Sequence, residues 1–426
     1  MTHSPVLRPV GAEERIDVLD VLRGWALLGI LLMNIEAFVG PLMVAITGLD
    51  PTLTGADRIV DAAIYILVQG KFYLLFSLLF GMGFAVMMAR AEATGRPFAA
   101  LYLRRTFALL AIGLVHLIVI WSGDILTLYA LIALVLLALF RHVPTSHLPG
   151  WALGFHALAW LFSAGPLLMG AMARMVPGAA TEVDKVMQAE TARVQVQIEA
   201  ERQVLGSGSF ADAVAHRAGE APEMLFFLLF AGGQVLGMFL LGMWFVRSGA
   251  IADPARFPRL YAWLRWGALP VGLGMMLVSF ALMPTADFTT ITFANGFGTL
   301  LSMIAALLMC LGYLAWIQRG LSTSLAPMLR VAAPAGRMAL TNYLAQSVIC
   351  TLIFYGYGLG YFEQLPRAWQ LPFAIALFAL QVAFSHWWLS RFRYGPMEWL
   401  WRAATYLHWP AMRRADRDGP LVQQPD

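Results

Sequence analysis

Long apolar blocks recur along the whole chain, separated by shorter segments that carry its charged residues, glycines and prolines. A run of about 20 apolar residues is what an α-helix needs to cross the hydrocarbon core of a bilayer. The pattern predicts ten membrane-spanning helices, at residues 22–44, 63–89, 106–122, 125–140, 151–173, 224–246, 262–283, 290–316, 338–359 and 369–389. It therefore predicts an all-α fold, a polytopic integral membrane helical bundle.

The polar segments between the blocks divide the chain into five parts. We expect a short N-terminal segment (1–21), a first bundle of five helices (22–173), a long segment (174–223), a second bundle of five helices (224–408) and a tail (409–426). Within 174–223, apolar residues recur at mostly three- or four-residue steps, which predicts an amphipathic helix on the outer surface. This helix belongs either to a solvated loop or to a lid.

Composition supports the membrane assignment. Of 426 residues, 60% are hydrophobic and only 13% are charged, whereas soluble domains are about a quarter charged. This excludes a soluble enzyme, a nucleic-acid-binding protein and a disordered chain. The expected partner is the lipid bilayer, with no nucleic acid, and a homodimer is compatible with the pattern.

Most of the 29 Lys and Arg residues fall in segments on the same side of the predicted membrane as the N-terminus. Basic residues collect in cytoplasmic loops, so the pattern predicts cytoplasmic termini and an even number of spans. The first block has no small-residue cleavage site after it, and we interpret it as a retained helix rather than a signal peptide.

Five polar side chains lie in or beside the predicted spans, all toward their outer ends: Asn34, Glu36, Lys71, His116 and Asp124. Ionisable groups in a bilayer core are costly and usually face a cavity or each other. Their shared depth predicts a polar chamber open to the outside. The alternatives are an ion pair of Glu36 with Lys71 that only joins helices, a packed His116, and an exposed Asp124 in the tight turn predicted at 121–124.

A second group of polar residues lies at the opposite, cytoplasmic end of the spans. Most of its arginines fit the ordinary belt of positive charge. Arg23 and Arg337 stand out, because each is beside a glycine, Gly24 or Gly336, where a phosphate group has room to approach. The candidates for binding an anionic ligand are Arg23, Arg104, Arg105, Arg337 and Asn342. The spacing of His, Cys, Asp and Glu predicts no metal site.

Several motifs in these regions resemble the YeiB-like family of bacterial membrane proteins, catalogued as domain of unknown function 418. They are RIDVLDVLRG (15–24), KF (71–72) with FSLLFGMG (76–83), GDIL (123–126), GRMALTNYLAQS (336–347) and RYGPMEWLWR (393–402). Together they cover nearly the whole chain. The resemblance implies a multi-pass protein of the bacterial cytoplasmic (inner) membrane.

The N-terminal half is also similar to membrane acyltransferases of the heparan glucosaminide acetyltransferase and acyltransferase-3 type. In these, an Arg-Gly pair opens the first helix and a His or Asn follows eleven residues after the arginine; here Asn34 follows Arg23 at that spacing. Their catalytic histidine just after the first helix has no counterpart, because no histidine lies between His3 and His116. Such a resemblance indicates fold more strongly than activity.

This resemblance implies an acyl-CoA co-substrate that enters from the cytoplasm between spans one, three and nine. His116, oriented by Asp124, is then the candidate general base or acyl carrier, and Asn34 the donor to the oxyanion. Glu36 and Lys71 would position an acceptor at the outer face, an envelope glycan or a small molecule.

Two other functions compete with acyl transfer. A transporter would use Lys71, Glu36 and His116 as a central binding site, although matched broken-helix signals are missing from the two halves of the sequence. A lipid-binding or scaffolding protein without chemistry would need none of these side chains.

Overall fold

The computed structural model describes residues 17–47, 50–95, 97–284 and 291–414. In these ranges the secondary structure is helical, apart from one isolated bridge between Phe392 and Arg413. This confirms the all-α prediction. Much of the predicted N-terminal segment (1–21) and part of the predicted tail (409–426) lie outside the described residues.

The helices of the first half precede the long polar segment. They are α1 (Asp17–Val39), α2 (Leu42–Thr47), α3 (Gly55–Leu67), α4 (Lys71–Ala93), α5 (Phe98–Val115) continued by the π-helical turn η2 (His116–Ile120), α6 (Leu126–Val135) continued by η3 (Leu136–Phe140), η4 (Thr145–His147) and α7 (Leu148–Ala173).

The second half begins with two long helices, α8 (Ala179–Ser207) and α9 (Phe210–Arg247). They are followed by η5 (Pro254–Arg256), α10 (Pro258–Trp263), η6 (Leu264–Ala268), α11 (Leu269–Leu282), α12 (Phe293–Gly320), α13 (Ala326–Arg330), α14 (Ala333–Arg337), α15 (Ala339–Phe354), α16 (Arg367–Arg391) and α17 (Pro396–Tyr406).

Seven helical stretches in the described ranges are long and apolar enough to cross a membrane: Val18–Val39, Gly55–Ala93, Phe98–Ile120, Thr145–Ala173, Pro258–Leu282, Phe293–Gly320 and Arg367–Arg391. Two shorter apolar helices, Leu126–Phe140 and Ala339–Phe354, accompany them. Together they coincide with every predicted block except 224–246, which lies inside α9. The chain is a polytopic helical membrane protein.

Two predicted spans are interrupted. The block 22–44 ends as a helix at Val39, and α2 begins only after Gly40 and Pro41, because proline cannot donate the next helical hydrogen bond. The block 63–89 is divided between α3 and α4 by a turn in which Gly70 has a φ of 84°, a conformation that glycine adopts without strain.

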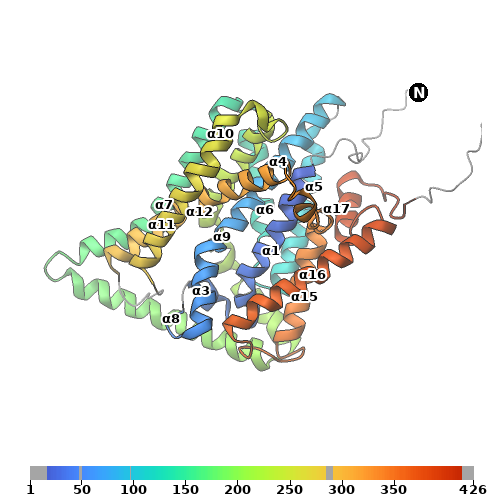
Figure 1. The fold of residues 1–426 in the computed structure, drawn as a ribbon. Helices are drawn as coiled ribbons and strands as arrows, with labels where there is room; N and C mark the ends of the chain where they lie inside the picture. The colour runs from blue at the N-terminus through green and yellow to red at the C-terminus, as the bar shows by residue number, and fades with distance from the viewer. Residues whose placement is uncertain (1–16, 48–49, 96, 285–290, 415–426) are drawn as a thin grey trace, which may run out of the picture.

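The amphipathic helix predicted within 174–223 is present as α8, and the same segment also holds the first residues of α9. Figure 1 shows α8 running across one end of the bundle, below the ends of the other helices. The Glu201 carboxylate of α8 accepts a hydrogen bond of 3.0 Å from the Leu42 amide of α2. We refer to this side of the molecule as the α8 end.

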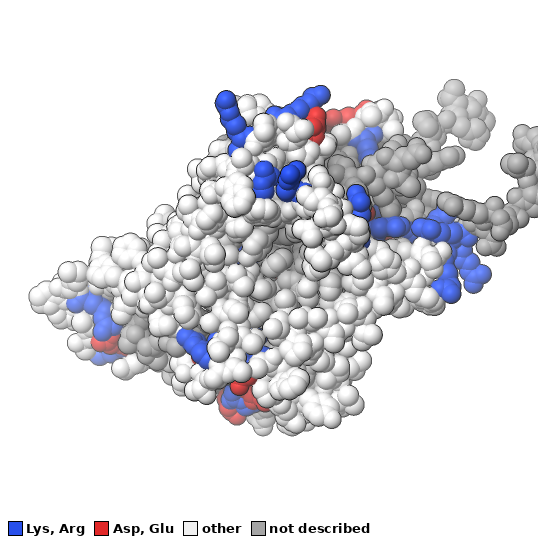
Figure 2. All heavy atoms as spheres, in the orientation of Figure 1, with Lys and Arg blue, Asp and Glu red and all other residues white. Residues whose placement is uncertain are grey.

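The opposite side contains the start of α1, the end of α4, the start of α5 and α17, and we refer to it as the arginine-rich end. Figure 2 shows Lys and Arg side chains along this end and a broad band of uncharged surface between it and the α8 end. Such a band is what a lipid-facing surface requires.

Candidate functional site

A cavity of about 330 Å³ opens at the arginine-rich end between α1, α4, α5, α6, α15 and α17. Its inner wall is apolar and includes Ile30, Phe80, Leu109 and Leu126. Its mouth carries six arginines, namely Arg23, Arg90, Arg105, Arg337, Arg393 and Arg402. A cavity with a cationic mouth and an apolar interior suits a ligand with an anionic head and an apolar tail.

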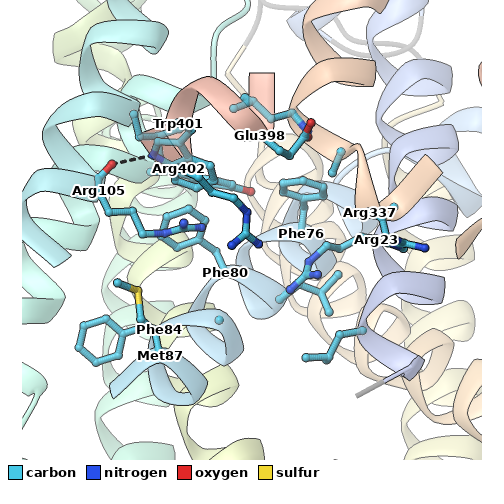
Figure 3. A pocket seen from close by; sticks show the side chains of 18 of the residues that line it. Arg23, Phe76, Phe80, Phe84, Met87, Arg105, Arg337, Glu398, Trp401 and Arg402 are labelled. Carbon is cyan, nitrogen blue, oxygen red and sulfur yellow. Dashed lines mark hydrogen bonds between the residues drawn. The ribbon is translucent and has the colours of Figure 1, made fainter. Parts of the chain in front are cut away.

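Aromatic side chains hold two of these arginines in place. The Arg105 guanidinium stacks 3.5 Å from the centre of the Trp401 ring, and the Trp401 indole donates a hydrogen bond of 2.8 Å to the Arg105 carbonyl. Arg402 lies over the Tyr394 ring at 4.7 Å. Figure 3 shows Arg105 and Arg402 across the cavity from Arg23 and Arg337, with Phe76 and Phe80 between them.

The two acidic residues that line the cavity offset only part of the charge of its six arginines. Asp20 pairs with Arg23 at 2.8 Å. Glu398 instead accepts hydrogen bonds of 2.7 and 3.1 Å from the amides of Leu340 and Thr341, at the start of α15. Burial raises the pKa of the Glu398 carboxyl. The mouth therefore keeps a surplus of positive charge.

Close backbone contact brings Arg23 and Arg337 to the same side of the mouth. A Cβ on Gly24 would lie 2.1 Å from the Ala332 carbonyl, and one on Gly336 would lie 2.0 Å from the Asp20 carbonyl. The space at these glycines is filled by helix against helix, not left for a phosphate as the sequence suggested. Their role is to let α1 and α14 touch.

His116 lies in a buried polar cluster with Asp124 and Ser347, which we call the His116 cluster. The His116 Nδ1 atom is 2.8 Å from Asp124 Oδ1, and its Nε2 atom is 2.9 Å from Ser347 Oγ. The side chains of His116 and Asp124 have no exposed surface, and Ser347 is fully buried. Asp124 is thus not an exposed turn residue.

Asp124 and His116 are each held in place by the backbone around them. The turn 121–125 joins the two halves of the predicted hairpin, and the Asp124 carboxylate accepts hydrogen bonds from the Leu126 and Thr127 amides at 3.2 and 2.7 Å. His116 begins the π-helical turn η2, where the Trp121 amide donates to the His116 carbonyl at 2.7 Å. Single π-helical turns are frequent at functional sites.

The cavity ends beside the His116 cluster. Ile125 and Tyr343 line the cavity, and each is adjacent to the cluster, Ile125 next to Asp124 and Tyr343 one helical turn before Ser347. The Tyr343 ring centre is 5.1 Å from that of His116. Tyr343 therefore separates the cavity from the cluster.

Glu36 belongs to a separate polar network. Arg367 of α16 pairs with the Glu36 carboxylate at 3.0 Å and with Asp61 of α3 at 3.1 Å, and it donates to Gln370 at 2.8 Å. The alternative of an ion pair between Glu36 and Lys71 is wrong, because the described cation of Glu36 is Arg367.

Lys71 makes different contacts again. It is fully buried at the start of α4, donates a hydrogen bond of 2.8 Å to the Tyr65 carbonyl, and lies 5.9 Å from the centre of the Tyr65 ring. The described contacts of Glu36, Lys71 and His116 share no residue, and none of the three lines the cavity described above. The structure therefore does not bring them into the single polar chamber that the sequence predicted.

Comparison with known proteins places the chain in a family. Residues 245–408 match the family described as "Protein of unknown function (DUF418)". The chain is 36% identical over 419 residues to the uncharacterized protein YxaH of Bacillus subtilis, covering 95% of this chain and 97% of that protein. It is 32% identical to the uncharacterized protein YeiB of Escherichia coli, covering 92% and 96%. The chain belongs to the DUF418 family.

The DUF418 match covers α15 and α17, so it includes Ser347 of the His116 cluster and half of the arginines at the mouth, namely Arg337, Arg393 and Arg402. Ser347 was not among the residues predicted to be functional, although it lies in the motif 336–347. Arg393 and Arg402 are among the cytoplasmic arginines that were interpreted as the ordinary belt of positive charge. The Gly-Pro start and aromatic pattern of 395–402 were the available signal for α17.

Three other predicted residues lie away from the cavity lining. Arg104 is exposed on α5 and does not line the cavity. Asn342 is buried and donates to the Ala335 carbonyl and to Ser385 Oγ at 3.1 and 3.0 Å, joining α15 to its neighbours. Asn34 is half-buried on α1, two residues and about 200° around the helix from Glu36.

Proposed function

We propose that this DUF418 protein is a membrane acyltransferase that moves an acyl group from acyl-CoA to an acceptor. The observation that carries the proposal is a cavity with an arginine-rich mouth and an apolar interior that ends at Tyr343, beside the His116 cluster. Arginines at the mouth suit the phosphates of CoA, and the apolar interior suits its acyl-pantetheine arm.

Within this proposal His116 is the general base. Asp124 accepts the hydrogen bond of the Nδ1 proton, which leaves the Nε2 atom unprotonated and able to take a proton from a hydroxyl or amine. Asn34 lies away from the cavity lining and is left out as the donor to the oxyanion. Arg23, Arg105 and Arg337 are the proposed phosphate ligands, while Arg104 and Asn342 are left out because they lie away from the cavity.

We further propose that the arginine-rich end faces the cytoplasm of the bacterial inner membrane, because basic residues are retained on that side. CoA would then enter from the cytoplasm, and the acceptor, an envelope glycan or a small molecule, would be met toward the α8 end. Reporter fusions to residue 426 and to the loop before α8 would test the orientation.

The experiment that tests acyl transfer uses the full chain in lipid nanodiscs. We expect acetyl-CoA to bind and to release free CoA thiol in the presence of membrane glycan extracts, and we expect His116→Ala and Asp124→Asn to lower that rate by about 100-fold or more. Arg104→Gln serves as the matched control. Acetyl-CoA turnover that is the same in His116→Ala as in the wild type would refute the proposal.

One observation favours a second function, transport of a small solute. The span Gly55–Ala93 is interrupted at 68–70, and Lys71 is fully buried directly after the break, as in transporters that bind substrate at broken helices. A transporter predicts uptake into proteoliposomes that responds to a pH gradient and is lost in Lys71→Met. The acyltransferase predicts that Lys71→Met keeps its turnover of acetyl-CoA.

A further inference from the structure

The hydroxyl of Ser347 is held by the imidazole of His116, which is in turn held by the carboxylate of Asp124. The two distances are 2.9 Å from Ser347 Oγ to His116 Nε2 and 2.8 Å from His116 Nδ1 to Asp124 Oδ1. These three residues come from three different segments, α15, η2 and the turn before α6. An oriented base that contacts a hydroxyl is the arrangement that activates serine as a nucleophile.

The groups that face the two ring nitrogens of His116 indicate which nitrogen donates a hydrogen bond and which accepts one. An ionised Asp124 carboxylate can only accept hydrogen bonds, as it does from the Leu126 and Thr127 amides, so in that form the Nδ1 atom of His116 is the donor. A neutral imidazole has one N–H, and the Nε2 atom is therefore an acceptor. Ser347 Oγ donates to it, in preference to the Tyr343 carbonyl at 3.4 Å.

Other buried serines in the described ranges lack this environment. Ser77, Ser279 and Ser385 are as fully buried as Ser347. Their described partners are the Tyr129 hydroxyl and the Tyr73 carbonyl for Ser77, the Tyr65 hydroxyl and the Gly298 carbonyl for Ser279, and the Asn342 amide for Ser385. In this set an imidazole contacts Ser347 alone, so burial in a helix does not account for its partner.

We infer that Ser347 is the residue that carries the acyl group, as an ester, between acyl-CoA and the acceptor. This inference rests on the proposed acyl transfer and assigns its covalent step. The Tyr343 ring lies between the cavity and His116, and its hydroxyl donates a long hydrogen bond of 3.3 Å to the Gly123 carbonyl. Rotation of this ring opens the path from the cavity to Ser347.

The first half-reaction transfers the acyl group to the protein. Ser347 Oγ attacks the thioester carbonyl carbon, the Oγ–C bond forms and the C–S bond breaks. The Oγ proton passes to His116 Nε2 and then to the CoA sulfur, which leaves as the thiol. Asp124 holds the imidazole in orientation and stabilises its charged form.

The second half-reaction restores the serine. The acceptor hydroxyl or amine attacks the ester carbonyl and gives its proton to His116 Nε2. The C–Oγ bond breaks, and the same proton returns to Ser347 Oγ. The two half-reactions need no oxidant, reductant or metal. CoA itself does not have to pass the His116 cluster.

The test uses the wild-type chain in nanodiscs with radiolabelled acetyl-CoA and no acceptor. We expect one acetyl group per chain, recovered on the peptide that contains Ser347, together with exchange of label between CoA and acetyl-CoA. Ser347→Ala should lower labelling and exchange by about 100-fold or more. Ser279→Ala is the matched control, because Ser279 is equally buried and doubly hydrogen-bonded but far along the chain from the cluster.

A cysteine at the same position gives a chemical signature that a structural role cannot imitate. In Ser347→Cys the bound acetyl should become a thioester, which neutral hydroxylamine cleaves, whereas the ester on the wild type requires alkaline hydroxylamine. Because the peptide is mapped in the wild type, poor folding of a variant does not decide the result.

The outcomes separate the two proposals. Turnover of acetyl-CoA without label on Ser347, or with wild-type exchange in Ser347→Ala, overturns the carrier role and leaves acyl transfer standing with direct attack by the acceptor. Absence of acetyl-CoA binding and of turnover in the wild type overturns both. Label on His116 in place of Ser347 also overturns the carrier role assigned to the serine.

Discussion

The guanidinium of Arg367 lies 3.0 Å from the carboxylate of Glu36, joining the start of α16 to the far part of α1. Both side chains are largely withdrawn from solvent, with 5% and 17% of their side-chain surface exposed. The same guanidinium also holds Asp61, so one cation serves two carboxylates from two different helices. This network sets the geometry of the α8 end.

Removal of Arg367 should therefore destabilise the protein. Arg367→Met removes the described cation of Glu36 and leaves Asp61 only its longer contact of 3.9 Å with Arg58. Breaking a buried ion pair on one side typically costs about 3–5 kcal/mol. Thermal unfolding in detergent measures the effect. Arg256→Met, which removes an exposed pair with Asp253, should unfold close to the wild type. Equal stability of the two variants would contradict the network.

The neighbouring residues Arg104 and Arg105 should differ in their effect on CoA binding. Arg105 lines the cavity and is stacked on Trp401, while Arg104 is exposed outside it. Loss of one charge-assisted contact predicts about a tenfold weaker affinity for CoA in Arg105→Gln and little change in Arg104→Gln. Titration calorimetry at low salt measures both, and an equal loss in the two variants would mean that CoA does not use this cavity.

Adding a methyl group at Gly336 should separate α1 from α14. The new Cβ would lie 2.0 Å from the Asp20 carbonyl, and overpacking of this kind costs about 1–3 kcal/mol. Gly274→Ala is a control of opposite sign, because nothing lies within 4 Å of its Cβ position and alanine is the better helix former. If the melting temperatures of the Gly336 and Gly274 alanine variants shifted in the same direction, this would argue against the contact between α1 and α14.

Glu201 should make the docking of α8 depend on pH. Burial raises the pKa of this carboxyl from its ordinary value of 4.5 to about 7, against the opposing hydrogen bonds from the Leu42 and Met43 amides. Between these values the folded chain holds a proton that the unfolded chain has lost, so stability falls as the pH rises from 4.5 to about 7.

Glu201→Gln should remove this part of the pH dependence. We expect the variant to match the wild type near pH 4.5 and to exceed its stability above pH 7, by ~1–3 kcal/mol. Unfolding midpoints across this range, with hydrogen exchange of α8 amides, measure it. Glu190→Gln, on the exposed surface of the same helix, is the matched control. If the stability of Glu201→Gln depended on pH as steeply as that of the wild type, another group would be the cause of the pH dependence.

The fold was largely predictable because a bilayer leaves few choices. Backbone groups in lipid must be paired within a helix, so the apolar blocks marked the spans directly. The interruptions at Pro41 and Gly70 were missed, since hydropathy averages over such short turns. The start of α9 was missed for the opposite reason, because its first residues are polar and read as part of a loop.

The site was only partly predictable. Periodicity places a side chain on its own helix but does not say which helix packs against it. The sequence therefore offered Lys71 as the alternative partner of Glu36, where the structure has Arg367. Arg104 and Arg105 are adjacent residues of the same type, but on a helix their side chains point about 100° apart. Ser347 lies 231 positions from His116, and a serine in an apolar helix carries no signal by itself.

The complete enclosure of the His116 cluster has a kinetic consequence. A serine ester beside a histidine base is lost to hydrolysis when water reaches it, because the base activates the water, and the transferred group is then wasted. Here neither Ser347 nor His116 has any surface open to solvent, so an ester formed there would persist until an acceptor arrived. The protein could thus be loaded on one side of the membrane and remain charged, storing one activated group per chain until it is needed on the other side.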